Sequence, residues 1–449
     1  MAPAGPPQGW SSLQDAPRNN GIAPRATLGH VLAFTFPGQG SQRPGMGRSW
    51  VDHPSWEVVA EASAAVGRDV ERLLLDAPME ELTQTANAQL ATFVQSLLVL
   101  DAVERVGLAP AACAGHSLGE YTALVAAGAI PFGEAAALVV ARGDAMAHAG
   151  EDAPGTMAAL LGISDDDAEA ACHRAEGDVW VANYNAPGQV VIAGTTDAVA
   201  AASDIARELG ARKVLPLPVS GAFHTPLMGA ARPGLRKALG DVVFSTPEVP
   251  VVANVDARVH SDPSEWPGLL SAQLCGPVRW RQTIETLAGL GATTFVEVGP
   301  GGVLTGLARR AAPEAQALSV ATPDDLDALL DAVAGAHGAD DPWRHEEHAH
   351  EGEHLYMSER VVVSPCAGIF APEQSLAAPG TGLLPGTAGR PGSGTAPSRV
   401  RTGDLVGRVG VTDVRTPFEG EVIRWLSVAG ERVQEGQPLV WLRVTEEGR

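Results

Sequence analysis

The sequence is poor in lysine and cysteine, and it has no excess of basic charge. Only Lys213 and Lys237 occur among 31 basic residues, and the formal net charge of the 449-residue chain is −22. A protein that reads nucleic acid needs a basic face for the phosphates, so we do not expect a nucleic-acid partner. An anionic substrate stays possible, because one well-placed arginine outweighs the net field locally.

The few cysteines and the pattern of apolar residues restrict the compartment. The four cysteines (positions 113, 172, 275 and 366) show no CxxC or zinc spacing, so we expect reduced thiols in a cytoplasmic protein. The N-terminal residues have no charged segment followed by an apolar one, as a signal peptide would. No apolar run reaches the length of a bilayer span, so no membrane partner is expected.

What the chain does contain is enough apolar material, 45% of residues, for two or three domains. Residues 1–30 are rich in Pro, Gly and Ala, and we expect a disordered arm there. From Val31 to residue 322, short apolar strands alternate with amphipathic helices, which predicts an α/β domain. Within it, residues 153–222 follow the order β-α-β-β-α-β, which predicts an inserted ferredoxin-like subdomain.

The C-terminal third differs in composition. Residues 323–359 are expected to form a helix and then an acidic, His-rich linker, whose histidines could bind a metal loosely or simply be solvated. Residues 360–446 predict a separate all-β domain. Its two similar halves flank a Pro/Gly/Ser-rich loop over residues 371–399.

The strongest local signal is the segment Gly115-His116-Ser117-Leu118-Gly119, a G-x-S-x-G pattern between an expected strand and an expected helix. The glycines allow a sharp turn that presents the Ser117 hydroxyl at the helix N-terminus, where developing negative charge is favoured. The pattern also occurs by chance, but its strand–turn–helix context favours a nucleophile. His116 is adjacent to Ser117, so its side chain diverges and it is expected to shape the site.

A serine nucleophile needs a base, and His224 is the best candidate. It follows the last strand of the inserted subdomain, where the chain re-enters the main domain; a purely structural histidine is the alternative. No Asp or Glu stands out as a third member.

The glycine-rich loop at 36–42 and the N–H group of Leu118 fit an oxyanion hole, although an ordinary strand–helix turn would look the same. Arg142 either ends a helix in solvent or is a buried guanidinium for a substrate carboxylate.

Six motifs in this order resemble malonyl-CoA:acyl-carrier-protein transacylases and the acyltransferase domains of polyketide synthases, over residues 31–320. They are FPGQGSQ (36–42), GHSLGEY (115–121), NYNAPGQVVIAG (183–194), GAFHTPLM (221–228), QLCGPVRW (273–280) and VEVGPGGVL (296–304). The resemblance implies an α/β-hydrolase-like core, an acyl-serine on Ser117 and general base catalysis by His224.

The same resemblance implies the other roles. The N–H groups of Gln39 and Leu118 would form the oxyanion hole, and Arg142 would bind the malonyl carboxylate. The backbone carbonyl of Gln273 would orient the histidine, which would explain the missing carboxylate. Phe223 would fill the space that an α-methyl group needs, so the enzyme would select malonyl-CoA over methylmalonyl-CoA.

The implied reaction transfers malonyl from malonyl-CoA to the phosphopantetheine thiol of an acyl carrier protein, in polyketide or fatty-acid synthesis, without metal or bound cofactor. Two alternatives stay open: a thioester hydrolase that edits carrier proteins, and a non-catalytic scaffold, against which the intact Ser117, His224 and Arg142 argue.

Residues 360–445 resemble a biotinyl/lipoyl-type hammerhead. In that family a lysine at a hairpin apex carries the cofactor, but here the stretch from Gly410 to Arg415 reads GVTDVR and no lysine follows Lys237. Biotin or lipoate attachment is therefore chemically excluded on this domain. We expect it to dock a partner, such as a synthase or carboxylase, or to be a passive fused domain.

Overall fold

The computed structural model describes residues 31–219 and 221–334, and in the C-terminal part residues 359–365, 368–373, 399–417, 419–425, 432–433 and 438–444. The arm at 1–30 and the His-rich linker expected before residue 359 lie outside the described residues. The chain divides into two compact units, Met1–Arg344 and His345–Arg449. Each is described by itself.

The first unit is built on a six-stranded sheet. Its strand order is β10 (Gln316–Val320), β9 (Thr294–Val298), β1 (Leu32–Phe36), β2 (Ala112–Gly115), β7 (Val251–Val252) and β8 (Val259–His260). The first five strands run parallel, and only β8 is antiparallel to its neighbour. Every residue of β1 is buried, as expected for a parallel strand that is covered on both faces.

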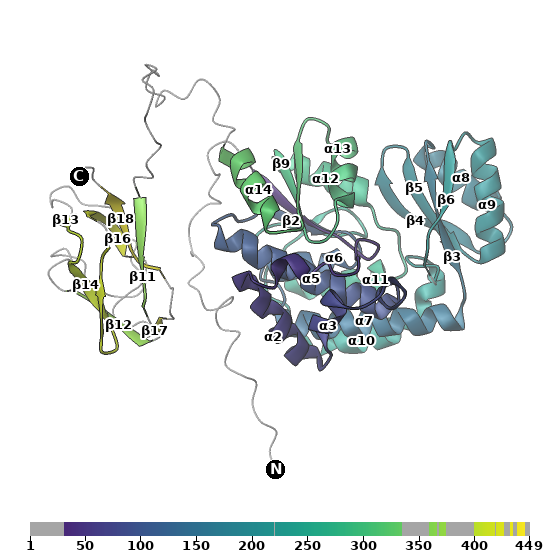
Figure 1. Ribbon diagram of the computed structural model, residues 1–449. Helices are drawn as coiled ribbons and strands as arrows, with labels where there is room; N and C mark the ends of the chain where they lie inside the picture. The colour runs from purple at the N-terminus through teal and green to yellow at the C-terminus, as the bar shows by residue number, and fades with distance from the viewer. Residues whose placement is uncertain are drawn as a thin grey trace, which may run out of the picture. The chain divides into compact units, whose positions relative to one another are not determined.

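Helices cover both faces of this sheet (Figure 1). Alternate β1 residues face opposite sides: Phe34 joins the core with α5 (Thr85–Arg105) and α6 (Gly119–Ala126), whereas Ala33 joins the core with α12 (Trp280–Gly289) and α13 (Val303–Ala311). Such a two-faced arrangement is the mixed α/β fold that the sequence predicts.

Helix α5 corrects one expectation from the sequence. It is long and apolar enough to cross a membrane by length and composition alone. However, 94% of its most apolar window is buried inside the protein, as in the core helix of a soluble fold.

Helix α7 (Phe132–Asp152) packs along α5, and further helices complete the main domain. They are α2 (Glu57–Val66), α3 (Val70–Leu75), α4 (Met79–Leu82), α10 (Arg232–Gly240), α11 (Trp266–Gln273), α14 (Asp324–Ala334) and the 3-10 helices η1 (Arg48–Trp50), η2 (Pro54–Trp56), η3 (Pro226–Ala231) and η4 (Pro263–Glu265). The apolar face of α14, with Leu326, Leu329 and Val333, is buried in the core of α5. Helix α14 therefore belongs to the first core, although the sequence grouped it with the linker.

A second, antiparallel sheet is inserted between α7 and η3. Its order is β4 (Val179–Ala186), β5 (Gln189–Gly194), β3 (Thr156–Leu161) and β6 (Lys213–Pro216). Helices α8 (Asp165–Arg174) and α9 (Thr196–Glu208) pack on this sheet with a separate apolar core. The elements follow the order that the sequence predicts for 153–222. The chain then returns to the main domain directly before His224.

The second unit consists of two four-stranded antiparallel sheets. Their orders are β11 (Glu359–Val363), β18 (Pro438–Val444), β16 (Gly420–Trp425), β13 (Arg399–Val400) and β15 (Thr412–Arg415), β14 (Leu405–Val409), β12 (Gly368–Pro372), β17 (Arg432–Val433). Strands β14 and β15 form a tight hairpin. Gly410 has a φ of 60° at its apex, and the side chain of Val411 is fully exposed there.

Candidate active site

The predicted nucleophile turn connects β2 to α6. Ser117 has a φ of 54°, a left-handed conformation that non-glycine residues rarely adopt. A Cβ atom on Gly119 would lie 2.0 Å from the carbonyl oxygen of Phe36, and one on Gly115 would lie 1.8 Å from the carbonyl carbon of Gly119. Only glycine fits at these two positions, so the pattern encodes the close packing of β1, β2 and α6.

The structure brings together Ser117, His224 and Gln273, as the sequence predicts. The Ser117 Oγ atom lies 2.7 Å from Nε2 of His224, and Nδ1 of His224 lies 2.9 Å from the backbone oxygen of Gln273. A carbonyl oxygen only accepts hydrogen bonds, so Nδ1 carries the proton and Nε2 accepts from the serine hydroxyl. A backbone carbonyl thus occupies the place that a carboxylate takes in a Ser-His-Asp triad.

The electrostatics of the site favour a neutral imidazole. Burial, together with the positive charge of Arg142, lowers the pKa of His224 to about 3. His224 is therefore an unprotonated acceptor at neutral pH. Like Ser117, it has a positive φ, here 62°, so both members of the pair occupy strained backbone positions.

Arg142 is fully buried, so the interpretation as a solvated helix end is wrong. Its Nη2 atom donates to Ser117 Oγ (3.0 Å) and to the Gln273 side-chain oxygen (2.9 Å). Its Nη1 atom donates to Gln89 at 2.6 Å, and the guanidinium lies 5.5 Å from the centre of the Tyr121 ring. The Nε atom is buried and has no partner among the described residues. A cation therefore lies directly beside the serine.

Gln89, which lies on α5, was not predicted from the sequence. Its side-chain oxygen accepts from Arg142, and its Nε2 atom lies 3.3 Å from the side-chain oxygen of Gln39. Gln89 thus connects the arginine to the glycine-rich loop after β1. The available signal was a polar side chain between the apolar Ala88 and Leu90, and α5 carries other polar residues of the same kind, such as Gln95.

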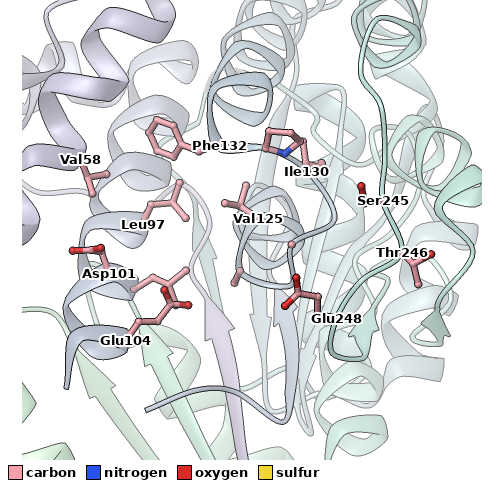
Figure 2. A pocket seen from close by; sticks show the side chains of 14 residues that line it. Val58, Leu97, Asp101, Glu104, Val125, Ile130, Phe132, Ser245, Thr246 and Glu248 are labelled. Carbon is pink, nitrogen blue, oxygen red and sulfur yellow. The ribbon is translucent and has the colours of Figure 1, made fainter. Parts of the chain in front are cut away.

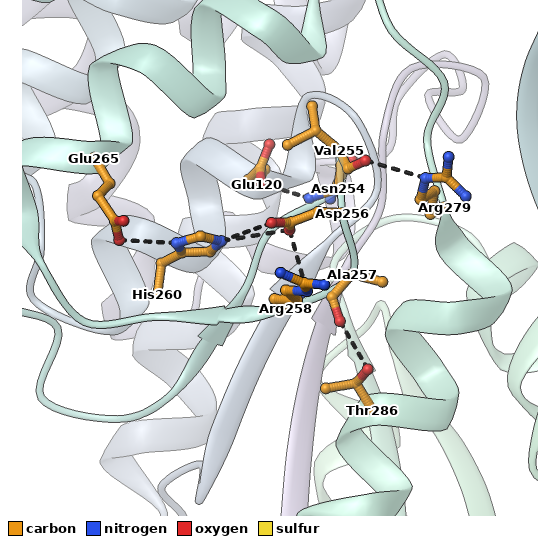
Figure 3. A network of polar contacts seen from close by, with 10 residues as sticks. All are labelled: Glu120, Asn254, Val255, Asp256, Ala257, Arg258, His260, Glu265, Arg279 and Thr286. Carbon is orange, nitrogen blue, oxygen red and sulfur yellow. Dashed lines mark hydrogen bonds and ion pairs between the residues drawn. The ribbon is translucent and has the colours of Figure 1, made fainter.

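Two further residues, Asn254 and Glu120, were also missed (Figure 3). Asn254 follows β7; its side-chain oxygen accepts from the Ser117 N–H at 2.7 Å, and its Nδ2 donates to Gly115 at 2.7 Å. Glu120 accepts from the Asn254 N–H at 2.8 Å and from Gln273 Nε2 at 2.5 Å. Burial raises the pKa of Glu120 to about 7.

The turn that carries Asn254 is also held from its outer side, as Figure 3 shows. Thr286 donates to the carbonyl of Ala257 at 2.7 Å, and Ala257 has a φ of 58°. His260 lies between Asp256, at 3.1 Å, and Glu265, at 2.9 Å. These contacts fix the turn on which the position of Asn254 depends.

A cavity of about 450 Å³ opens beside the serine. It is lined by Ser117, His224, His116, Phe223 and Gln39, together with residues of the inserted sheet. His116 lies 2.9 Å from Asn185 of that sheet, so it does shape the cavity wall. Leu118 is fully buried, and its backbone caps the start of α6. Within the described ranges, no cluster of His, Cys, Asp and Glu side chains suits a metal ion.

A second cavity, of about 320 Å³, contains none of the predicted residues. Figure 2 shows its apolar walls and its carboxylates. The lining includes Phe132, Ile130, Val125, Leu97, Asp101, Glu104 and Glu248. None of Ser117, His224 and Arg142 lines it, so it is separate from the site around the serine.

A serine–histidine pair on a strand–turn–helix is typical of enzymes that pass an acyl group through a serine. The protein-family model described as "Acyl transferase domain" matches residues 33–323 of this chain. The malonyl CoA-acyl carrier protein transacylase of Bacillus subtilis (strain 168) is 39% identical over 304 residues, which cover 67% of this chain and 96% of the relative. That of Salmonella typhimurium is 43% identical, with 67% and 98% covered. The chain belongs to the malonyl CoA-acyl carrier protein transacylase family.

Solved structures agree with this assignment. An acyl-carrier-protein S-malonyltransferase from Burkholderia pseudomallei superposes with a TM-score of 0.65 at 44% identity, over 67% of this chain and 99% of that chain. A malonyl-transacylase in complex with a type II polyketide synthase acyl-carrier protein gives 0.65 at 38% identity, over 68% and 99%.

Proposed function

We propose that this chain transfers the malonyl group of malonyl-CoA to the phosphopantetheine thiol of an acyl carrier protein through a malonyl-Ser117 intermediate. The observation that carries the proposal is that Ser117 Oγ contacts both a neutral imidazole, at 2.7 Å, and a buried guanidinium, at 3.0 Å. A base and a carboxylate receptor thus meet at one hydroxyl.

In the first half-reaction, Ser117 Oγ attacks the thioester carbonyl while its proton passes to Nε2 of His224. The N–H groups of Leu118 and Gln39 stabilise the oxyanion, since one begins α6 and the other lies on the loop lining the cavity. The C–S bond then breaks, and the proton on His224 leaves with the sulfur as coenzyme A.

The second half-reaction runs in the reverse sense. His224 takes the proton of the carrier-protein thiol as its sulfur attacks the malonyl ester. The oxyanion forms again at the same N–H groups, the C–O bond breaks, and Ser117 recovers its proton. Catalysis is therefore ping-pong: Ser117 is the nucleophile in the first half and the leaving group in the second, and His224 takes and returns one proton in each.

Selectivity for malonyl follows from Arg142 and Phe223 in this proposal. A free carboxylate can form charge-assisted hydrogen bonds with the buried guanidinium, whereas acetyl offers it no partner. Phe223 is nearly buried and lines the cavity, so its ring competes for the space of an α-methyl group.

The decisive experiment is intact-protein mass spectrometry after brief incubation with malonyl-CoA, methylmalonyl-CoA or acetyl-CoA, with Ser117→Ala as the control. We expect malonyl label that Ser117→Ala lacks and that holo carrier protein removes. Label lost to water alone, at the same rate without carrier protein, would instead indicate a hydrolase.

For the second unit we propose a biotinyl/lipoyl-like domain that carries no cofactor and docks a synthase or carboxylase partner of a fatty-acid or polyketide pathway in the cytoplasm. The β14–β15 hairpin supports this, because its apex presents Val411 where that family presents lysine. Incubation with biotin ligase or lipoate ligase should leave the mass unchanged. A mass gain on this unit would refute the proposal.

A further inference from the structure

Gln273 makes four hydrogen bonds at the centre of the site. Its backbone oxygen accepts from His224, and its side-chain oxygen accepts from Arg142. Its Nε2 atom donates to the Ser117 carbonyl at 2.7 Å and to Glu120 at 2.5 Å. A single residue therefore contacts the nucleophile, the base and the cation, and Glu120 is its carboxylate partner.

The orientation of the Gln273 amide matters, because its oxygen only accepts hydrogen bonds and its NH₂ group only donates them. If the amide were reversed, its NH₂ group would face the Arg142 guanidinium, which has no acceptor. Its oxygen would then face the Ser117 carbonyl and the Glu120 carboxylate, both of which only accept. Only the observed orientation satisfies all three neighbours.

Glu120 enforces this orientation from a fully buried position. Its two oxygens accept from two different donors, the Asn254 N–H and Gln273 Nε2. An ionised carboxylate is the one group of this shape that accepts on both sides. The same side chain also holds Asn254, whose own oxygen accepts from the Ser117 N–H.

We propose that Glu120 is a positioning residue for malonyl selectivity: by fixing the Gln273 amide, it keeps an acceptor against Arg142 and so holds the guanidinium where a malonyl carboxylate can reach it. The inference rests on the proposed function. It assigns no contact between Glu120 and the substrate.

The isosteric change Glu120→Gln tests this directly. The new amide must keep its oxygen on the Asn254 N–H, so its NH₂ group faces Gln273 Nε2. Two donors then meet, and the Gln273 amide reverses to relieve them, which places its NH₂ group against Arg142. Two donors, the Gln273 NH₂ group and the Arg142 guanidinium, then face each other without an acceptor. In Glu120→Gln this should lower the ratio of malonyl to acetyl acylation of Ser117 on the order of ten- to a hundredfold.

The matched control is Glu297→Gln. Glu297 is an equally buried carboxylate of the same domain that accepts from the Thr305 N–H at 2.7 Å and from its hydroxyl at 2.9 Å. We expect the control to leave the malonyl-to-acetyl ratio unchanged, whatever its effect on thermal unfolding. Labelling of Ser117 by an alkyl fluorophosphonate, which has no carboxylate, reports whether each variant retains a folded serine–histidine pair.

The outcomes distinguish a failure of the positioning role of Glu120 from a failure of the proposed malonyl transfer. A ratio that stays at the wild-type value in Glu120→Gln, or that falls equally in both variants, overturns the positioning role. A variant that loses fluorophosphonate labelling as well shows that Glu120 acts through folding alone, which also overturns it. A wild-type chain that accepts no malonyl group refutes the proposed function itself.

Discussion

Replacing Arg142 by alanine should slow the acylation of Ser117 by malonyl-CoA but not its acylation by acetyl-CoA. The guanidinium has five N–H groups, and three of them bind Ser117, Gln273 and Gln89. In the proposed function, the N–H groups that remain, one on Nη1 and the one on Nε, bind the substrate carboxylate. Arg142→Ala removes these donors and also the hydrogen bond that Ser117 Oγ accepts.

The magnitudes follow from burial. Arg142 is 0% exposed, and leaving a buried charged partner unpaired costs about 3–5 kcal/mol, so acylation by malonyl-CoA should slow by about 10²- to 10⁴-fold. Acetyl-CoA has no carboxylate. When Ser117 attacks acetyl-CoA, the substrate forms no ion pair with Arg142. The rate of acetylation in Arg142→Ala should therefore equal the wild-type rate or exceed it by at most about tenfold.

The assay is single-turnover acylation of Ser117, followed by intact mass with each thioester. Arg105→Ala is the control, because Arg105 is half-exposed and pairs with Asp101 and Glu57 away from the serine. Equal slowing with malonyl-CoA and acetyl-CoA would refute the reasoning, since it would show that Arg142 supports the turn rather than the substrate carboxylate.

Three other predictions follow from the same geometry. His224→Ala should slow acylation of Ser117 by about 10²- to 10⁴-fold, measured by single-turnover mass, and a smaller loss would mean that another base acts. Because the pKa of His224 is lowered to about 3, its base form persists on acidification, so stopped-flow rates of Glu120→Gln, which lacks the carboxyl with a pKa of about 7, should show no inflection near 6.5 between about pH 8 and pH 5; such an inflection would contradict this. Gly119→Ala places a Cβ atom 2.0 Å from the Phe36 oxygen, so thermal unfolding should show a loss of several kcal/mol, and an unchanged melting temperature would refute the steric argument.

The turn at Ser117 could be predicted from the sequence because the residues that determine its conformation are neighbours in the chain. The two glycines are fixed by close approaches within the segment and to the preceding strand, and the strand–turn–helix order is visible in the hydrophobic pattern. The pairing of Ser117 with His224 was less certain from the residues alone. The two lie 107 positions apart, and the resemblance rather than the spacing connected them.

The residues that hold the pair could not be predicted in this way. Gln89 is 53 positions from its partner Arg142, and Asn254 is 137 positions from Ser117. Their contacts depend on how α5 and the end of β7 pack around α6. Arg142 was ambiguous for the same reason, because only the packing of α5 against α7 decides that its side chain is buried.

The common signal of these residues is a polar side chain within an apolar segment. Gln89 interrupts the apolar stretch of α5, and Asn254 follows the buried strand β7. Burying such a group without a partner is costly, so each one implies a partner elsewhere in the chain. In this protein the partners converge on Ser117 and Arg142. The cost of burying Arg142 and Glu120 is therefore offset by a shared set of hydrogen bonds, and removing any one member should disturb substrate choice before it disturbs the fold.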